Sequence, residues 1–284
     1  MRFLFVSLFL LFLSSADAVA QELVRYRVVY DFSQAVIEGR PTMQTRWAID
    51  VGDTTVASYN YNSRQFNKEI DSLRKVVNDD NLFFEKRNQL VMKYPGSGAQ
   101  IVIGLPASGK YTLTGIDGGS VNGEFLYEEV LPAIEWEDND STKTIEGYLC
   151  HKATGRLYGR TWTAWYAGDI PLPYGPYLLG GLPGLILEAT DSDSLFRFTL
   201  AGLSSVADGS KVEFVGVGKY LKCTREQYIK QRNKFDSMSS AERIKLAEER
   251  LSAASGKKQK IVSLNKGKET THVKTPKRVH IEKE

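Results

Sequence analysis

The stretch Gly147–Glu188 reads GYLCHKATGRLYGRTWTAWYAGDIPLPYGPYLLGGLPGLILE and contains two strand-like runs on either side of a turn-rich loop. Prolines stiffen the loop and glycines turn it, at Pro171, Pro173, Pro176, Pro183, Gly175, Gly180, Gly181 and Gly184. In Leu182-Pro183-Gly184-Leu185, proline sets φ to about −65° at the second turn position and glycine accepts a positive φ at the third. This order predicts a type II turn, after which Leu185-Ile186-Leu187 continues as an apolar strand.

The first run of the stretch, Leu157 to Ala167, has the alternation of a strand. Successive side chains of a strand point to opposite faces, so Tyr158, Arg160, Trp162, Ala164 and Tyr166 are expected to share one face. The other face is expected to carry Thr161, Thr163 and Trp165. Because both faces carry aromatic residues, we expect both to be at least partly covered.

Similar strand signals recur along the chain, separated by turn residues. They lie at 22–32, 46–51, 54–61, 100–104, 111–115, 123–131, 143–151, 195–200 and 212–221, with an acidic turn at 137–140. Residues 67–77 repeat apolar side chains at helical spacing, which indicates a short surface helix or an ordered connection. Strands at this spacing favour an antiparallel sandwich or a curved open barrel over βαβ units. The predicted class is mainly β (α+β).

The composition changes after Cys223. Thr224-Arg225-Glu226-Gln227 and Ser239-Ser240-Ala241-Glu242 both have the form of a capping box, which predicts a helix after each. From Ser255 onward the chain is rich in lysine and has no aromatic residue, which predicts disorder. The expected organisation is therefore an export signal at 1–20, a β-rich domain at 21–222, a helical segment at 223–254 and a disordered basic tail at 255–284.

The first twenty residues have the pattern of a removable export signal. Arg2 supplies the positive start, Phe3 to Leu13 form a short apolar core, and Ala18-Val19-Ala20 is an A-x-A cleavage site. The apolar stretch is too short to span a bilayer, no cysteine at the cleavage point offers a lipid anchor, and no later segment has spanning length. We expect cleavage near Ala20 and a mature chain without a transmembrane span, in the periplasm, at the outer membrane or outside the cell.

The glycine- and proline-rich loop also resembles a known family. Gly181-Leu182-Pro183-Gly184-Leu185-Ile186 reads GLPGLI, and it is accompanied by Gly147-Tyr148-x-Cys150-x-Lys152-Ala153, Gly159-Arg160, Ala164-Trp165-Tyr166, Ile170-Pro171 and Gly175-Pro176. This set closely resembles the GLPGLI family of exported proteins of Gram-negative bacteria, and weaker similarity extends over most of residues 21–203. The resemblance marks Cys150 and Gly181–Ile186 as motif positions that we expect to be structural. The family has no established activity, so the resemblance implies a location and not a reaction.

Charge and cysteine content constrain the partners. The net charge is only +3, and the excess of basic residues lies in the tail. An exported protein rarely meets DNA, so we expect no nucleic-acid partner, and anionic lipid is the better electrostatic partner for the tail. A solvated, soluble terminus is the commoner meaning of such a tail. Cys150 and Cys223 face an oxidising compartment, but the sequence leaves open whether they form a disulfide or remain free, buried thiols.

Common catalytic and metal sites have little support. His272 and His280 lie in the expected tail, and His151 cannot pair with its neighbour Cys150 on one strand because adjacent side chains point to opposite faces. A zinc site needs three or four clustered ligands. Residues 104–110, GLPASGK, have the spacing of a phosphate-binding loop, but Tyr111 follows where a hydroxyl should bind magnesium and no helix is expected there. We therefore expect no catalytic residue, no metal and no cofactor.

The best binding candidates are the aromatic and arginine side chains of the stretch Gly147–Glu188: Arg160, Trp162, Trp165, Tyr166, Tyr174 and Tyr177. They could stack against, or donate hydrogen bonds to, a lipid, glycan or protein of the envelope. The favoured alternative is that the rings fill the core and Arg160 pairs with a carboxylate or a loop carbonyl.

The leading functional hypothesis is a non-enzymatic envelope protein that binds a hydrophobic, glycan or protein partner along a curved sheet. One alternative is an envelope hydrolase that uses two facing carboxylates, which the acids at 124–137 are numerous enough to supply. Another is a structural accessory of an outer-membrane complex, which would expose a flat apolar patch.

Overall fold

The computed structural model describes residues 22–35, 42–94, 99–115, 124–213 and 220–239, individual positions between 241 and 252, and residues 280–282. The expected export signal at 1–20 lies outside the described residues, as does the part of the expected basic tail at 255–279.

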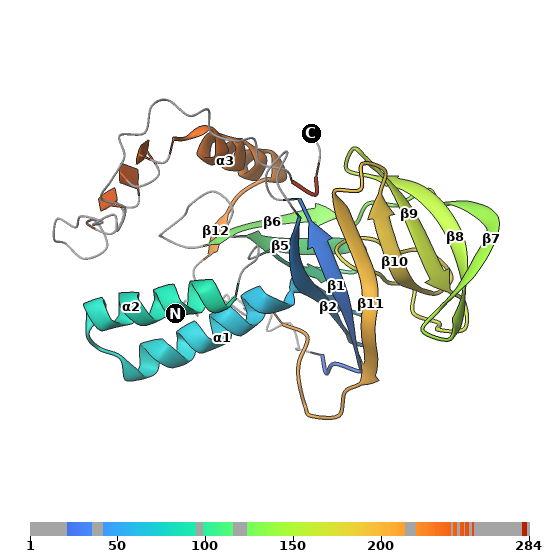
Figure 1. Cartoon of the computed structure of the whole chain (residues 1–284), viewed down its shortest axis with the longest axis horizontal. Helices are drawn as coiled ribbons and strands as arrows, with labels where there is room; N and C mark the ends of the chain where they lie inside the picture. The colour runs from blue at the N-terminus through green and yellow to red at the C-terminus, as the bar shows by residue number, and fades with distance from the viewer. Residues whose placement is uncertain are drawn as a thin grey trace, which may run out of the picture.

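Within the described ranges, one sheet of twelve strands forms the body of the protein (Figure 1). The strand order is β12-β6-β5-β4-β3-β2-β1-β11-β10-β9-β8-β7. Neighbouring strands run antiparallel except for β12 and β6, which are parallel. The predicted mainly β class with an antiparallel curved sheet is confirmed. The strands are β1 Tyr26–Gln34, β2 Met43–Val51, β3 Val56–Asn60, β4 Gln100–Ile103, β5 Lys110–Gly115, β6 Glu124–Val130, β7 Glu137–Ile145, β8 Tyr148–Leu157, β9 Arg160–Ala167, β10 Leu185–Asp191, β11 Phe196–Ser205 and β12 Tyr220–Lys222.

Alternating side chains divide the sheet into two apolar faces. One face carries the main core, in which Phe32, Trp47, Trp162 and Phe198 pack together. The opposite face carries a smaller cluster that includes Val24, Ala48, Ala57, Tyr59, Val102 and Val212. The sheet curves around the main core. β5 and β8 lie far apart in the strand order, yet the hydroxyls of Tyr111 on β5 and Tyr158 after β8 are 2.7 Å apart.

In the described part of the chain, the helices α1, α2 and α3 flank the sheet, and each begins at a side-chain cap. The Asn60 side chain caps α1 (Tyr61–Val76) and the Asp79 side chain caps α2 (Asp80–Lys93). Thr224 and Gln227 form the predicted capping box at the start of α3 (Arg225–Ser237). The helix expected at 67–77 is confirmed but begins earlier, because Asn60 accepts the Ser63 amide at 3.2 Å. Figure 1 shows α1 and α2 projecting from the sheet as a hairpin.

The strand boundaries at 137–167 differ from those expected. The acidic residues 137–140 form part of β7 and not a turn. Two-residue turns interrupt the strands expected at 143–151 and 157–167, at Glu146-Gly147 and Tyr158-Gly159, where both residues of each pair have positive φ. Positive φ at both positions matches the twist of a hairpin. Tyr158 therefore lies in a turn, outside β9.

The strand expected at 212–221 is also corrected. Lys211 forms an isolated bridge with Leu23, residues 214–219 lie outside the described part of the chain, and β12 is a short strand at Tyr220–Lys222. Its parallel pairing with β6 places the start of α3 beside that end of the sheet.

Candidate functional site

The loop between β9 and β10 is held by main-chain hydrogen bonds. Leu185 N donates to Ile170 O at 3.0 Å, and Ile186 N donates to Tyr174 O at 3.0 Å. The predicted type II turn at 182–185 is wrong, because that turn would direct Leu185 N to Leu182 O. Positive φ occurs at Gly181, at 86°, and not at Gly184.

Gly184 is required for a different reason, which is the close approach of β9. A Cβ atom at this position would lie 2.1 Å from the Ala167 carbonyl oxygen, far inside any normal contact. A glycine therefore lets the loop close directly against the end of β9. Leu182, Leu185 and Ile186 are buried in the main core. In this structure the GLPGLI segment is a packed corner.

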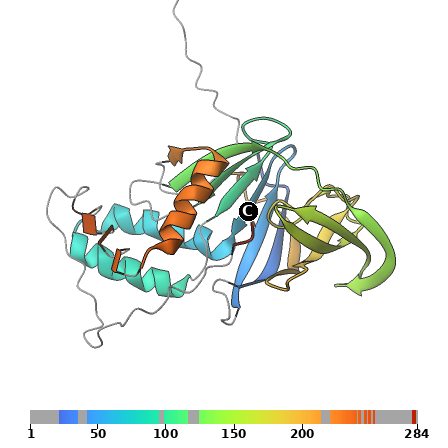
Figure 2. The same ribbon diagram turned by 90° about the horizontal axis from the view of Figure 1, so that it is seen from above.

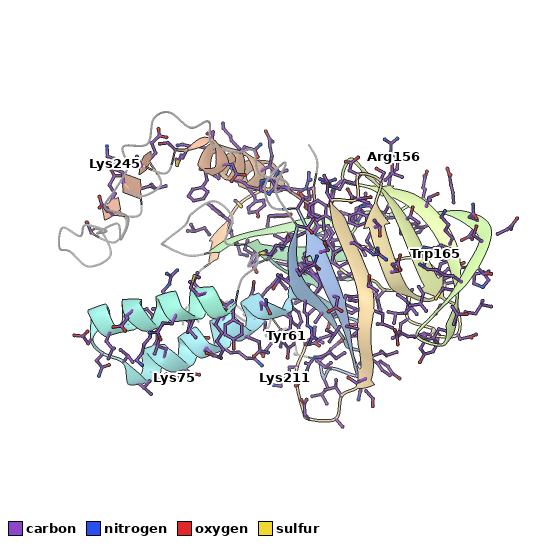
Figure 3. The ribbon with its side chains drawn as sticks, viewed as in Figure 1. Tyr61, Lys75, Arg156, Trp165, Lys211 and Lys245 are labelled. Atoms are coloured by element: carbon purple, nitrogen blue, oxygen red, sulfur yellow. The ribbon has the colours of Figure 1, made fainter. Side chains whose placement is uncertain are left out.

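Most of the predicted binding side chains do not gather into one site. Trp162 is only 1% exposed and Tyr166 only 7%, and both belong to the main core. Trp165, labelled in Figure 3, lies on the other face of β9 by the alternation of that strand, and the Lys143 ammonium is 4.3 Å from the centre of its ring. Tyr174 is partly buried, and its main chain forms a bridge with Gly180.

Arg160 is the first of two predicted residues that do take part in a common site. It begins β9 and is buried, with its guanidinium 4.6 Å from the centre of the Phe196 ring. Its Nη1 donates to Asp191 Oδ2 at 2.6 Å. Its remaining nitrogens reach the far end of the chain: Nη2 donates to His280 O at 2.7 Å and Nε donates to Ile281 O at 2.8 Å.

Tyr177 is the second, and it contacts the next residue of the same segment. Its hydroxyl donates to Glu282 Oε1 at 2.5 Å. Arg225, the first residue of α3, donates from Nη2 to Glu282 Oε2 at 2.8 Å, and the Tyr127 hydroxyl of β6 lies 3.5 Å from Oε1. The Glu282 side chain is thereby buried, with 5% of its surface exposed. The Arg225 guanidinium also lies 4.2 Å from the centre of the Tyr158 ring.

We call this arrangement the Glu282 site: the side chains of Arg160, Tyr127, Tyr177 and Arg225, with residues 280–282 bound between them. His280 Nε2 and Asp236 Oδ2 of α3 are 2.5 Å apart, and Ile281 packs against the main core. Figures 1 and 2 both show residues 280–282, in dark red, between α3 and the strands β8–β10. The predicted disorder is therefore wrong for residues 280–282.

The tyrosines of the site are held as neutral donors. Burial, followed by the negative charge of Glu282, raises the pKa of Tyr177 well above its ordinary value. Burial and the Glu282 carboxylate also raise the pKa of Tyr127. An un-ionised hydroxyl can donate to a carboxylate, whereas a phenolate would repel it. The site is thus suited to an anion.

Sequence reasoning missed Tyr127, Arg225 and Glu282. Tyr127 and Glu282 are 155 positions apart, so no local spacing links them. Arg225 was identifiable only as part of a capping box, and Glu282 only as one acid in a lysine-rich tail. Ile281 was the only local sign that this part of the tail contacts the body, because it is an apolar side chain next to Glu282.

The other chemical candidates have ordinary surroundings. His151 is exposed on β8, with its ring 5.8 Å from that of Tyr166. Residues 104–110 form the β4–β5 hairpin connection, closed by Gly104 N donating to Lys110 O at 2.8 Å. Cys150 and Cys223 are free thiols. Within the described ranges, no three His, Cys, Asp or Glu side chains are grouped so that they could hold a metal ion.

No family model matches this chain, and no curated protein is similar to it in sequence. Two solved structures of PNGF-II, in the P21 and C2 space groups, are similar to it, with 14% and 15% identity and TM-scores of 0.49 and 0.50. Each likeness covers 76% of this chain and 34% of the PNGF-II chain, so this chain spans about a third of the length of that protein. At this identity the likeness shows the fold alone.

None of the helices in the described part of the chain has the length and apolar character needed to cross a membrane.

Proposed function

We propose that this chain is an exported protein of the cell envelope that binds a partner at the Glu282 site without transforming it. Export is supported by the signal pattern at 1–20 and by the resemblance of residues 181–186 to the GLPGLI family. Binding is supported by one observation above the others: the body of the protein holds a separate stretch of chain by two carbonyls and one carboxylate.

The state of the acids favours binding over hydrolysis. A hydrolytic pair needs one carboxyl to donate a proton while the other activates water or attacks. Asp191 instead accepts Arg160 through one oxygen and the amides of Leu195 and Phe196 through the other. Glu282 is engaged by a cation on one oxygen and a tyrosine on the other. Both carboxylates are thus held as charged acceptors and neither is placed to donate a proton.

A photo-crosslinking experiment in the source organism tests the proposal. Benzoylphenylalanine in place of Tyr158, which lies beside Arg225, should give an adduct in the envelope fraction on irradiation. The same substitution at Tyr26, an exposed residue of β1, is the matched control and should not give that adduct. The crosslinked chain should lack residues 1–20 by mass, and its partner should be recovered intact.

Three results would contradict the proposal. Retention of residues 1–20 in a cytosolic chain would remove the export part. Identical adducts from Tyr158 and Tyr26 would remove the site. A partner recovered as a cleaved fragment, and cleaved again by the purified chain, would replace binding with hydrolysis.

A further inference from the structure

We propose that the Glu282 site recognises an acidic peptide segment of another polypeptide, and that residues 280–282 of this chain occupy it in cis. This inference rests on the proposed function, since it names the ligand class and the regulation of the same site. It follows from how the main chain and the carboxylate of the bound segment are held.

The main-chain contacts identify the ligand as a polypeptide. Arg160 donates to two successive carbonyls, those of His280 and Ile281. A glycan or lipid carboxylate would need only the donors around Glu282 and would leave these two bonds unmade. Arg160 is also fixed independently of the segment, because it pairs with Asp191 and lies over the Phe196 ring. Donors positioned in advance lower the cost of ordering a ligand.

The carboxylate contacts identify the ligand as acidic. Tyr177 and Arg225 converge on Glu282, and Arg225 Nε is buried without a hydrogen-bond partner among the described residues. If the segment leaves, a cation and a buried hydroxyl lose their acceptor. Water can satisfy the vacated donors, but a carboxylate forms stronger charge-assisted hydrogen bonds with them, so the vacated site favours a second carboxylate over water.

The neighbouring residue adds an apolar requirement. Ile281 precedes the glutamate and packs against the main core. The ligand pattern is therefore an apolar residue followed by glutamate, with two free carbonyls on its amino-terminal side. His280 adds a contact to α3, through Asp236 at 2.5 Å.

Residues 280–282 occupy the donors of the site and so compete with any free ligand. Residue 280 follows the end of α3 at residue 237 by 43 positions (280 − 237). A covalent connection of this sequence length gives the segment an effective concentration of about a millimolar at most. A free peptide in trans must overcome that local concentration, so weakening the cis segment should expose the site.

Fluorescence anisotropy with a labelled peptide tests this directly. The probe is Val-His-Ile-Glu-Lys-Glu, the sequence of residues 279–284, and the protein is the mature full chain. Glu282→Gln in the chain should raise its affinity for the probe at least tenfold, because the cis segment loses its charge-assisted bonds. Glu85→Gln on the exposed surface of α2 is the charge-matched control and should bind as the wild type does.

Site variants in the Glu282→Gln chain then locate the binding. Arg225→Gln and Tyr177→Phe should each lower affinity for the probe at least tenfold, and a probe with glutamine in place of its first glutamate should lose as much. Arg156→Gln and Tyr26→Phe, at exposed positions, are the matched controls and should change nothing. An unchanged melting temperature in Tyr177→Phe separates loss of binding from loss of fold.

Several outcomes would overturn the inference. Equal binding of the glutamate and glutamine probes would exclude acidic recognition, and equal affinity of the wild-type and Glu282→Gln chains would exclude the cis competitor. A concentration-dependent dimer of the wild type that disappears in Glu282→Gln would assign the site to a second copy of this chain. If the Tyr158 adduct persists while the probe fails to bind, only the ligand class is wrong; loss of both removes the proposed function.

Discussion

Two buried carboxylates, Asp50 and Glu282, are satisfied by the same kinds of donor in different ways. Asp50 receives Arg27 through two bonds of 2.6 and 3.0 Å, Arg64 at 2.8 Å and the Tyr59 hydroxyl at 3.0 Å. Glu282 likewise receives an arginine and tyrosine hydroxyls. Both side chains are almost completely removed from water.

The difference lies in how each carboxylate is brought to its donors. The partners of Asp50 lie 9, 14 and 23 positions away, on the adjoining elements β3, α1 and β1. Asp50 itself is fixed in the ladder of β2. The partners of Glu282 lie 57 to 155 positions away, and Glu282 belongs to no helix or strand. If residues 280–282 compete with a ligand as proposed, the same chemistry builds a permanent part of the fold in one region and a separable contact in the other.

The largest expected effect separates these two regions by stability. Asp50→Asn should lower the free energy of unfolding by about 3–5 kcal/mol, because it leaves the buried Arg64 and the partly buried Arg27 without a counter-charge. Glu282→Gln should cost about 1 kcal/mol or less, since the segment can leave and its donors can rehydrate. Urea unfolding of both variants measures the difference. Equal losses would show that residues 280–282 are as integral to the fold as β2.

The next expected effect concerns the loop that carries Tyr177. Gly184→Ala should destabilise the protein by about 1–3 kcal/mol, because the added Cβ meets the Ala167 main chain, which cannot rotate away. It should also weaken docking of the 280–282 segment by moving the loop. Gly168→Ala is the matched control, since its Cβ would meet nothing within 4 Å and its φ is not positive. That variant should be neutral or slightly more stable.

Tryptophan fluorescence during urea unfolding measures the free energy of unfolding of both glycine variants. A normal stability for Gly184→Ala would mean that the corner between β9 and β10 yields easily. The loop would then belong with the separable region and not with the region around Asp50.

These contrasts also explain which features the sequence could predict. The alternation in β9 and the Thr224 capping box are local patterns, and the structure confirms both. Positive φ in a turn is usually indicated in the sequence by glycine, asparagine or aspartate. The turns at 146–147 and 158–159 were missed because Glu146 and Tyr158 adopt positive φ, and neither residue type predicts it. Pro183-Gly184 has the composition of a turn. Glycine is required at position 184 for another reason, because a Cβ atom there would collide with the Ala167 main chain.

The candidate site was only half predictable for the same reason. Arg160 and Tyr177 stood out because charged and aromatic side chains are concentrated in the stretch Gly147–Glu188. Tyr127, Arg225 and Glu282 come from three other parts of the chain, and only the tertiary fold brings them together. The Asp50 site shows the opposite limit, where short separations make a buried network part of the local fold.

The smallest expected effect comes from a third carboxylate, Glu22, near the start of the expected mature chain. Burial alone would raise its pKa, but hydrogen bonds from the hydroxyls and amides of Thr54 and Thr55 lower it from 4.5 to about 2. A carboxyl with a lower pKa in the folded state stabilises the fold above pH 4.5, and this stabilisation is lost as the pH falls toward 2.

Glu22→Gln should therefore cost less than about 1 kcal/mol at pH 7, because solvent still reaches and screens this partly buried group. The difference in unfolding free energy from the wild type should shrink on acidification. Thermal unfolding of both chains at pH 7, 4 and 3 measures this, with Glu85→Gln on the exposed surface of α2 as the control for loss of one carboxylate. A difference that stays constant for Glu22→Gln would mean that the four hydrogen bonds of Glu22 do not depend on charge. Neutral donors would then be enough to fix a chain end, and the acid specificity inferred for Glu282 would have to come from Arg225 alone.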